Sequence, residues 1–109
     1  MTDLLQQQCQ ACEGSIAPMT ASEIQTLREK TPLWQVNAEG TTIERHFNFK
    51  SFLPVMAFAN AVAWIAHQQK HHPDMTLGYN YCTVRYTTHA ISGLSENDFI
   101  CAAKIDTLL

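Results

Sequence analysis

The chain has 109 residues, of which 46% are hydrophobic and 16% are charged, and its formal net charge is −3. This length predicts a single domain over residues 1–109, with one core that buries roughly two-thirds of the unfolded surface. The hydrophobic content excludes disorder as the main state. The seven Lys and Arg residues are scattered along the chain, which excludes nucleic acid as a partner because phosphate contacts need clustered cations.

No membrane segment or secretory leader is recognisable in the sequence. The first fifteen residues have neither a basic start nor an apolar run. The most apolar stretch, residues 52–66, contains a proline and an asparagine and is shorter than the roughly 20 residues that a membrane span needs. We therefore expect a cytoplasmic protein without membrane contact.

A Cys-x-x-Cys pair, Cys9 and Cys12, lies in a polar lead-in of residues 1–18. Such a pair can be a redox motif or half of a zinc site. A zinc site needs a second pair, whereas Cys82 and Cys101 lie far apart in apolar runs. A redox motif needs a strand before the pair and a helix after it, and here a glycine interrupts the chain at once. We expect a mobile, chemically inert N-terminus.

The first helix is predicted from a capping box. Thr20-x-x-Glu23 lets each side chain satisfy a backbone amide of the other residue. Met19 and Ile24 occupy the two positions that pack together across such a helix start. Pro32 ends the helix.

Two strands are predicted next, over residues 34–36 and 42–49, joined by a turn at Glu39-Gly40. The second strand alternates, with one face made of Ile43, Arg45, Phe47 and Phe49 and the other of Thr42, Glu44, His46 and Asn48. Such alternation is typical of an antiparallel sheet with one packed and one open face.

The main helix is expected over residues 51–70, with Ser51 as its cap and Pro54 in its first turn. Its apolar stripe consists of Phe52, Val55, Met56, Ala59, Val62, Ala63 and Ala66. Phe58 and Trp64 widen the apolar surface beyond one stripe. This surplus indicates a homo-oligomer, a dimer or a tetramer, in which a second copy covers the other side.

The last part of the chain predicts an extended piece over residues 75–78, a strand over 81–88 and a helix that begins at the capping pattern Ser95-x-x-Asp98. In the strand, the inward face is Cys82, Val84 and Tyr86, and the opposite parity holds Tyr81, Thr83, Arg85, Thr87 and His89. The predicted fold is α+β, a four-stranded antiparallel sheet with three helices packed on one face, in the order α-β-β-α-β-β-α.

Four of the five histidines fall within 23 residues: His67, His71, His72 and His89. Imidazole can both donate and accept a proton near neutral pH, so this cluster is a candidate for acid/base catalysis. The alternative is structural: a histidine pair before a proline can be a helix terminus that interacts with the helix dipole. For His46, which lies apart, we expect a structural or solvent-exposed role.

A metal site is the second alternative. His67 and His71 have the i, i+4 spacing that places two imidazoles on one helical face. A third ligand would have to come from His89 or Asp98, and position 68 is Gln rather than the usual base. We therefore favour a site without metal.

The sequence resembles the pterin-4a-carbinolamine dehydratase family over about residues 10 to 106. The residues that carry the resemblance are Lys70-His71-His72-Pro73, Tyr79-Asn80, Thr88-His89, Gly93-Leu94-Ser95-Glu96-Asn97-Asp98, Trp34, Ile43-x-Arg45-x-Phe47-x-Phe49 and Ala59-Asn60-x-Val62-Ala63. The resemblance implies the fold just described and dehydration of a 4a-hydroxytetrahydropterin to quinonoid dihydropterin. That reaction recycles tetrahydrobiopterin for aromatic amino-acid hydroxylases, and it needs no metal, nucleotide or other cofactor.

The resemblance also implies roles for individual residues. His71 and His89 would be the acid/base pair on opposite sides of the pterin ring, and His72 would bind and orient the ring. The substrate-binding positions would be His72, Pro73, Thr88 and Asp98. Asp98 would orient an imidazole, cap the last helix, or do both.

Two positions depart from the family pattern: His67 stands where Glu is frequent, and Met75 where Trp is frequent. Two other functions fit the same resemblance. One is a non-enzymatic module that binds pterin or protein, since some members are also dimerisation cofactors of a homeodomain transcription factor. The other is a dehydratase of another pterin pathway, such as molybdopterin metabolism.

Overall fold

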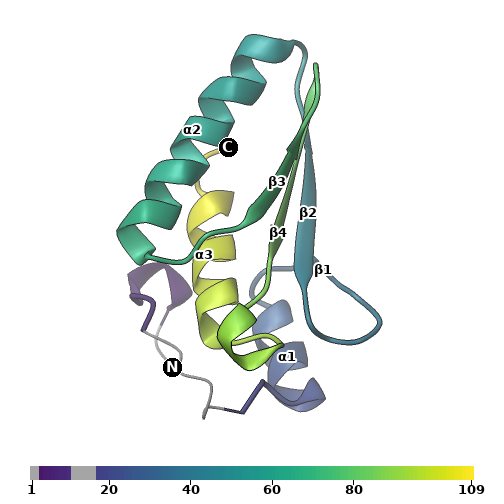
Figure 1. Ribbon diagram of the computed structural model, residues 1–109, viewed down its shortest axis with the longest axis vertical. Coiled ribbons are helices and arrows are strands. Elements are labelled where there is room, and N and C mark those ends of the chain that lie inside the picture. Colours follow the sequence, from purple (N-terminus) through teal and green to yellow (C-terminus); the bar gives the residue numbers. More distant parts are fainter. Residues whose placement is uncertain (1–2, 11–16) are drawn as a thin grey trace.

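The computed structural model describes residues 3–10 and 17–109. Three α-helices and a four-stranded antiparallel sheet form an α+β fold, with α2 and α3 on one side of the sheet and α1 beside α3 (Figure 1). The elements are η1 (Leu4–Gln6), α1 (Ala21–Arg28), β1 (Gln35–Val36), β2 (Ile43–Asn48), α2 (Phe52–Gln69), β3 (Asp74–Leu77), β4 (Tyr81–Tyr86), η2 (His89–Ile91) and α3 (Glu96–Asp106), where η marks a 3₁₀ turn. The predicted fold class and element order are confirmed.

The sheet has the strand order β1-β2-β4-β3, and all its pairings are antiparallel. The predicted alternation is confirmed for Ile43, Phe47, Cys82, Val84 and Tyr86, which are buried on the inward face. Arg45 of the same predicted face is only half-buried, and Phe49, also half-buried, lies just beyond β2. The predicted end of the strand over 81–88 is wrong, because β4 ends at Tyr86 and His89 begins η2. A backbone bridge between Thr88 and Gly93 closes this turn.

The predicted stripe of helix α2 is confirmed for Val55, Ala59, Val62 and Ala66 and is wrong for Phe52 and Ala63. Its buried residues are Val55, Phe58, Ala59, Val62 and Ala66. Phe58 belongs to the core because its ring lies 4.5 Å from that of Phe47 in β2, whereas Phe52 is 50% exposed and Ala63 is exposed. Trp64 stays 61% exposed, so the apolar surplus on this helix does lie at the surface.

The two predicted capping boxes are confirmed. At α1, Thr20 Oγ1 accepts from the Glu23 amide at 3.2 Å and Glu23 Oε1 accepts from the Thr20 amide at 2.9 Å. At α3, Ser95 and Asp98 form the second box. The expected cap of α2 is only partly right, because Ser51 occupies the cap position but its side chain makes no capping hydrogen bond.

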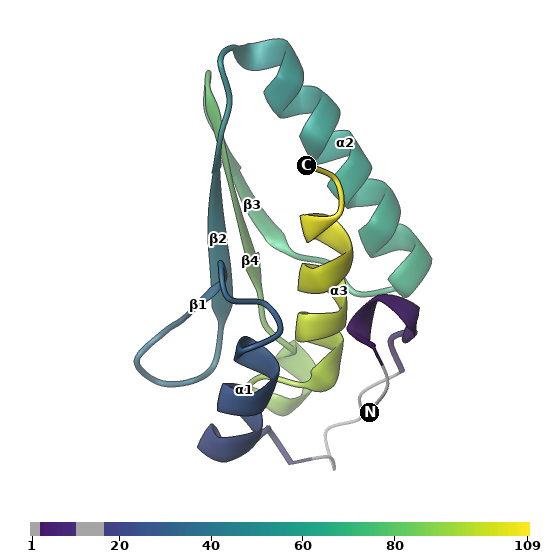
Figure 2. The ribbon, with the colours of Figure 1, turned by 180° about the vertical axis from the view of Figure 1, so that it is seen from behind.

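The prediction of a mobile N-terminus is wrong for residues 3–10, which pack beside the ends of α2 and α3 (Figure 2). Leu4 is buried in the core, and the Cys9 amide donates to Gln69 Oε1 at 2.8 Å. Cys9 Sγ lies 3.6 Å from Cys101 Sγ. This contact and burial raise the pKa of Cys9, whereas a redox-active thiol needs a lowered pKa. Cys12 lies outside the described residues.

Across residues 3–10 and 17–109, no helix combines the length and the apolar character that a membrane span requires.

Candidate active site

Three of the five histidines line one hollow of about 370 Å³. Its walls come from the end of α2, the segment between β4 and α3, the first turn of α3, and the N-terminal segment. The lining residues are Gln10, Lys70, His71, His72, Thr87, Thr88, His89, Ala90 and Asn97. A larger hollow of about 730 Å³ lies between α1 and α3, but its described lining contains no histidine or cysteine. The smaller hollow is therefore the candidate active site.

The end of α2 places the histidine pair. Lys70 adopts the left-handed conformation, with φ 54° and ψ 39°, and ends the helix. The His71 amide then donates back to the Ala66 carbonyl at 3.1 Å, as in a typical helix C-terminus. The chain turns at this point, so His71 is largely buried, with a side chain 13% exposed, while His72 is exposed.

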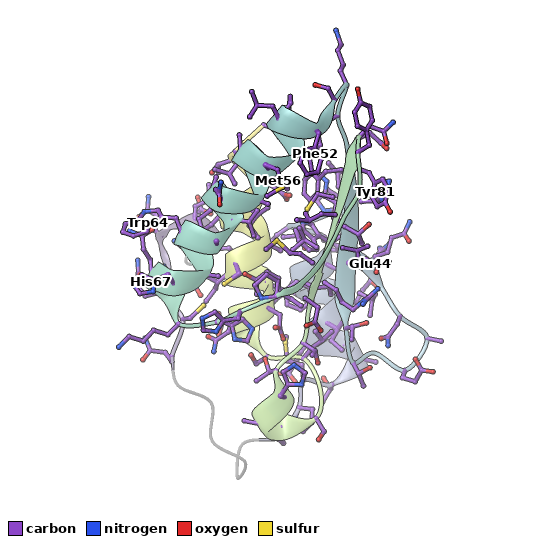
Figure 3. The ribbon with its side chains drawn as sticks, turned by 45° about the horizontal axis from the view of Figure 1, so that its top comes forward. Glu44, Phe52, Met56, Trp64, His67 and Tyr81 are labelled. Atoms are coloured by element: carbon purple, nitrogen blue, oxygen red, sulfur yellow. The ribbon has the colours of Figure 1, made fainter. Side chains whose placement is uncertain are left out.

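The same turn removes the basis of the metal hypothesis. His71 has left the helix, so the i, i+4 relation to His67 no longer places the two rings on one face. His67 is exposed on α2 and stacks on Trp64 with ring centroids 5.8 Å apart (Figure 3). In the part of the chain that the structure describes, no three His, Cys, Asp or Glu residues are grouped so that they could hold a metal ion.

Asp98 connects the histidine pair to α3. Its carboxylate is fully buried, and Oδ1 lies 2.5 Å from His71 Nε2. The other oxygen, Oδ2, accepts from Thr88 Oγ1 at 2.8 Å and from the Ser95 amide at 3.0 Å. Since Thr88 donates its only hydroxyl proton to Asp98, the Ser95 hydroxyl, 2.7 Å away, donates to Thr88. Asp98 thus both caps the helix and holds an imidazole.

The ring of His71 is held on a second side by Tyr86 of β4. The two rings stack with centroids 5.2 Å apart and planes inclined by 10°, and the Tyr86 hydroxyl donates to the His71 carbonyl at 3.3 Å. Burial of the imidazole opposes its charged form and lowers its pKa. The hydrogen bond and the negative charge of Asp98 outweigh burial, so that the pKa of His71 is raised above its ordinary value.

The two other histidines of the hollow are held differently. His72 and His89 are both exposed, and neither ring makes a hydrogen bond or ion pair with residues 3–10 or 17–109. Thr88 lines the hollow as expected, although its hydroxyl is engaged with Asp98 and Ser95. Pro73 and Asp98 are absent from the described lining, so Asp98 acts on the hollow through the two lining residues that it binds, His71 and Thr88.

Among the contributors to this site that sequence reasoning missed are Tyr86, Gln10 and Asn97. The inward parity of Tyr86 predicted only that it lies in the core. Gln10 stands in a polar stretch without periodicity, so no local signal marked it. Asn97 directly precedes Asp98, but the capping pattern assigns a role only to Ser95 and Asp98.

The comparisons with known proteins identify the family of the chain. Residues 17–108 match the family model for pterin 4 alpha carbinolamine dehydratase. The chain belongs to this family. The predicted resemblance is therefore confirmed.

Two bacterial relatives of this pterin dehydratase family cover almost the whole chain. A protein of Nitrosospira multiformis, provisionally named pterin-4-alpha-carbinolamine dehydratase, is 58% identical over 97% of this chain and 92% of its own length. A protein of Legionella pneumophila with the same provisional name is 49% identical over 99% of this chain and 96% of its own.

Two solved structures of pterin dehydratase relatives share the fold. The transcriptional coactivator/pterin dehydratase of Brucella melitensis superposes with a TM-score of 0.79 at 30% identity, over 84% of this chain and 97% of that chain. A pterin dehydratase-like protein described as a RuBisCO assembly factor in the alpha-carboxysome superposes with a TM-score of 0.60 at 24% identity, over 69% and 87% of the two chains. The second likeness concerns the fold alone.

Proposed function

We propose that this protein is a hydro-lyase that dehydrates a 4a-hydroxytetrahydropterin to quinonoid dihydropterin and water by histidine acid/base catalysis. The observation that carries the proposal is the His71–Asp98 pair, whose imidazole faces the hollow that His72 and His89 also line. Membership of the pterin dehydratase family supplies the substrate class.

His71 is the general acid in this proposal. The hydroxyl on C4a of the substrate is a poor leaving group until it receives a proton. Asp98 raises the pKa of His71, so that a larger share of His71 is protonated near neutral pH and can donate that proton. Since Nε2 of His71 is bound to Asp98, Nδ1 is the ring nitrogen that transfers the proton. The C–O bond then breaks and water leaves.

His89 is the general base, and His72 binds and orients the ring. As the C–O bond breaks, the N5 lone pair forms the new double bond to C4a, and the N5 proton passes to His89. His71 has then lost one proton and His89 has gained one. His89, which is exposed, returns its proton to solvent, and His71 regains a proton from water in the hollow that it lines, so that the cycle is closed without metal or cofactor.

The wider setting also belongs to this proposal. The substrate is formed by aromatic amino-acid hydroxylases, so the protein acts in tetrahydrobiopterin recycling in the cytoplasm, as a homo-oligomer that covers the exposed apolar surface of α2. The alternative is a regulatory module that binds a pterin or a protein without catalysis. The Brucella melitensis protein is named both a transcriptional coactivator and a pterin dehydratase, so this alternative is tested together with catalysis.

The decisive experiment follows the disappearance of 4a-carbinolamine by ultraviolet absorbance while a hydroxylase generates it. The wild-type protein is expected to accelerate dehydration, and His71→Ala and His89→Ala are each expected to lower turnover by about 100-fold, the usual scale for loss of a general acid or base. His46→Ala is the matched control, because His46 is exposed and bonded to Thr83 on the open sheet face, away from the hollow.

Each outcome selects one function. Acceleration that is lost in His71→Ala but kept in His46→Ala supports the dehydratase. Acceleration that survives both active-site substitutions would contradict histidine catalysis. A folded protein that binds a stable pterin without accelerating dehydration would favour the regulatory module.

A further inference from the structure

The N-terminal strap, defined as residues 3–10, completes the wall of the candidate active site. Gln10 lines the hollow together with His71, His72 and His89, although it is about 60 positions away from the nearest of them in the chain. We propose that Gln10 is a substrate-binding residue of the pterin pocket and that Asn97 positions it. This inference rests on the proposed dehydratase function and adds a binding group to the same site.

Gln10 is fixed by its backbone. Its amide donates to Asn97 Oδ1 at 3.0 Å, and Asn97 Nδ2 donates to the Gln10 carbonyl at 2.6 Å. This reciprocal pair uses the side-chain amide of a buried residue in the first turn of α3, one position before Asp98. The strap is therefore anchored on the same helical turn that holds His71.

Further contacts hold the part of the strap that precedes Gln10. The Cys9 amide donates to Gln69 Oε1 at 2.8 Å, and Gln69 Nε2 donates to Gln8 Oε1 at 2.9 Å. Lys104 Nζ donates to the Leu5 carbonyl at 2.9 Å. Contacts with both α2 and α3 thus hold the strap so that Gln10 lies at the rim of the hollow.

The side chain of Gln10 is left available for a ligand. It is exposed, and within residues 3–10 and 17–109 its amide group makes no hydrogen bond. A carboxamide offers two donors and an acceptor, which complements the amide-like pyrimidine edge of a pterin, where N–H groups adjoin a carbonyl. The imidazoles of the hollow supply the proton transfers, and a neutral amide adds recognition without changing charge.

The test separates binding from catalysis. Gln10→Ala is expected to raise KM about fivefold, the size of one neutral hydrogen bond, with kcat within about twofold of wild type. Asn97→Ala, which releases the backbone of Gln10, is expected to raise KM similarly. The double variant is expected to have a KM no higher than that of the weaker-binding single variant, because both substitutions remove the same contact between Gln10 and the substrate. Gln6→Ala is the matched control, since Gln6 is an exposed glutamine of the strap outside the hollow.

The same variants are compared for equilibrium binding of 7,8-dihydrobiopterin, so that the two proposals fail separately. An unchanged KM for Gln10→Ala in an active enzyme overturns the role of the strap and leaves the dehydratase standing. A wild-type protein without activity overturns the dehydratase, and about fivefold weaker pterin binding by Gln10→Ala then still supports the role of Gln10. Equal binding by the two proteins, or no binding at all, overturns it.

Discussion

The two sides of the candidate active site hold their histidines in opposite ways. His71 is bonded to a buried carboxylate, stacked on Tyr86 and largely hidden from solvent. His89 lies exposed in a 3₁₀ turn, without a hydrogen bond to the described part of the chain. The first imidazole has a fixed position and a raised pKa, whereas the second is exposed to solvent. We therefore expect the first histidine, and not the second, to be coupled to folding stability.

Removal of Asp98 tests this coupling with the largest effect. Asp98→Ala leaves the Ser95 amide and the Thr88 hydroxyl buried without their acceptor and removes the partner of His71. The expected loss of unfolding free energy is about 3 kcal/mol or more, measured by urea denaturation. Asp74→Ala, at an exposed position of β3, is expected to change it by less than about 0.5 kcal/mol. Equal stability of the two variants would contradict the coupling.

The pH dependence of stability is a second test of the interaction between His71 and Asp98. Because the folded-state pKa of His71 lies above its unfolded value, the stabilisation is fully present below the ordinary histidine pKa near 6.5 and is lost as pH rises through the raised pKa. The unfolding free energy of wild type should therefore fall relative to that of His71→Gln over this upward range. Urea titrations at a series of pH values measure the difference, and parallel curves would show that His71 and Asp98 are not coupled.

Tyr86→Phe tests a smaller part of the same wall. The substitution keeps the ring that stacks on His71 and removes only the hydroxyl that donates to its carbonyl at 3.3 Å. We expect a loss of about 1 kcal/mol or less in unfolding free energy and turnover within about threefold of wild type. Tyr81→Phe serves as the control, because Tyr81 stacks on His46 on the open face of the sheet. A hundredfold loss of turnover in Tyr86→Phe would assign the hydroxyl a catalytic part.

His89→Ala should have the smallest effect on stability. The side chain is exposed and unpaired within the described residues, so the unfolding free energy is expected to change by less than about 0.5 kcal/mol. Turnover is nevertheless expected to fall by about 100-fold. A clear loss of unfolding free energy in His89→Ala would show that His89, like His71, contributes to the stability of the fold.

Local patterns predicted most of the fold. Capping boxes marked the starts of α1 and α3, and alternation identified the buried faces of β2 and β4. These signals arise from neighbouring residues, so they survive without knowledge of the tertiary structure. The stripe of α2 was assigned less well, because the choice between Phe52 and Phe58 depends on where the sheet lies.

The site could be predicted only in part for the same reason. The His71-His72-Pro73 motif and the Ser95-x-x-Asp98 pattern were visible, but the sequence did not show that they meet. The docking of residues 3–10 was missed because a stretch rich in glutamine has no hydrophobic period, and its anchors lie on distant helices. Contacts between segments far apart in the chain leave no local trace.

The double use of Asp98 limits which acid can stand at that position. A glutamate would complete the capping box of α3 equally well, since this motif commonly ends in Glu. The additional methylene would displace the carboxylate from a buried position where one oxygen caps the helix and the other lies 2.5 Å from His71. Aspartate and glutamate would thus cap α3 equally well, but only aspartate places its carboxylate against His71. Asp98→Glu is therefore expected to keep the helix and to impair the candidate site.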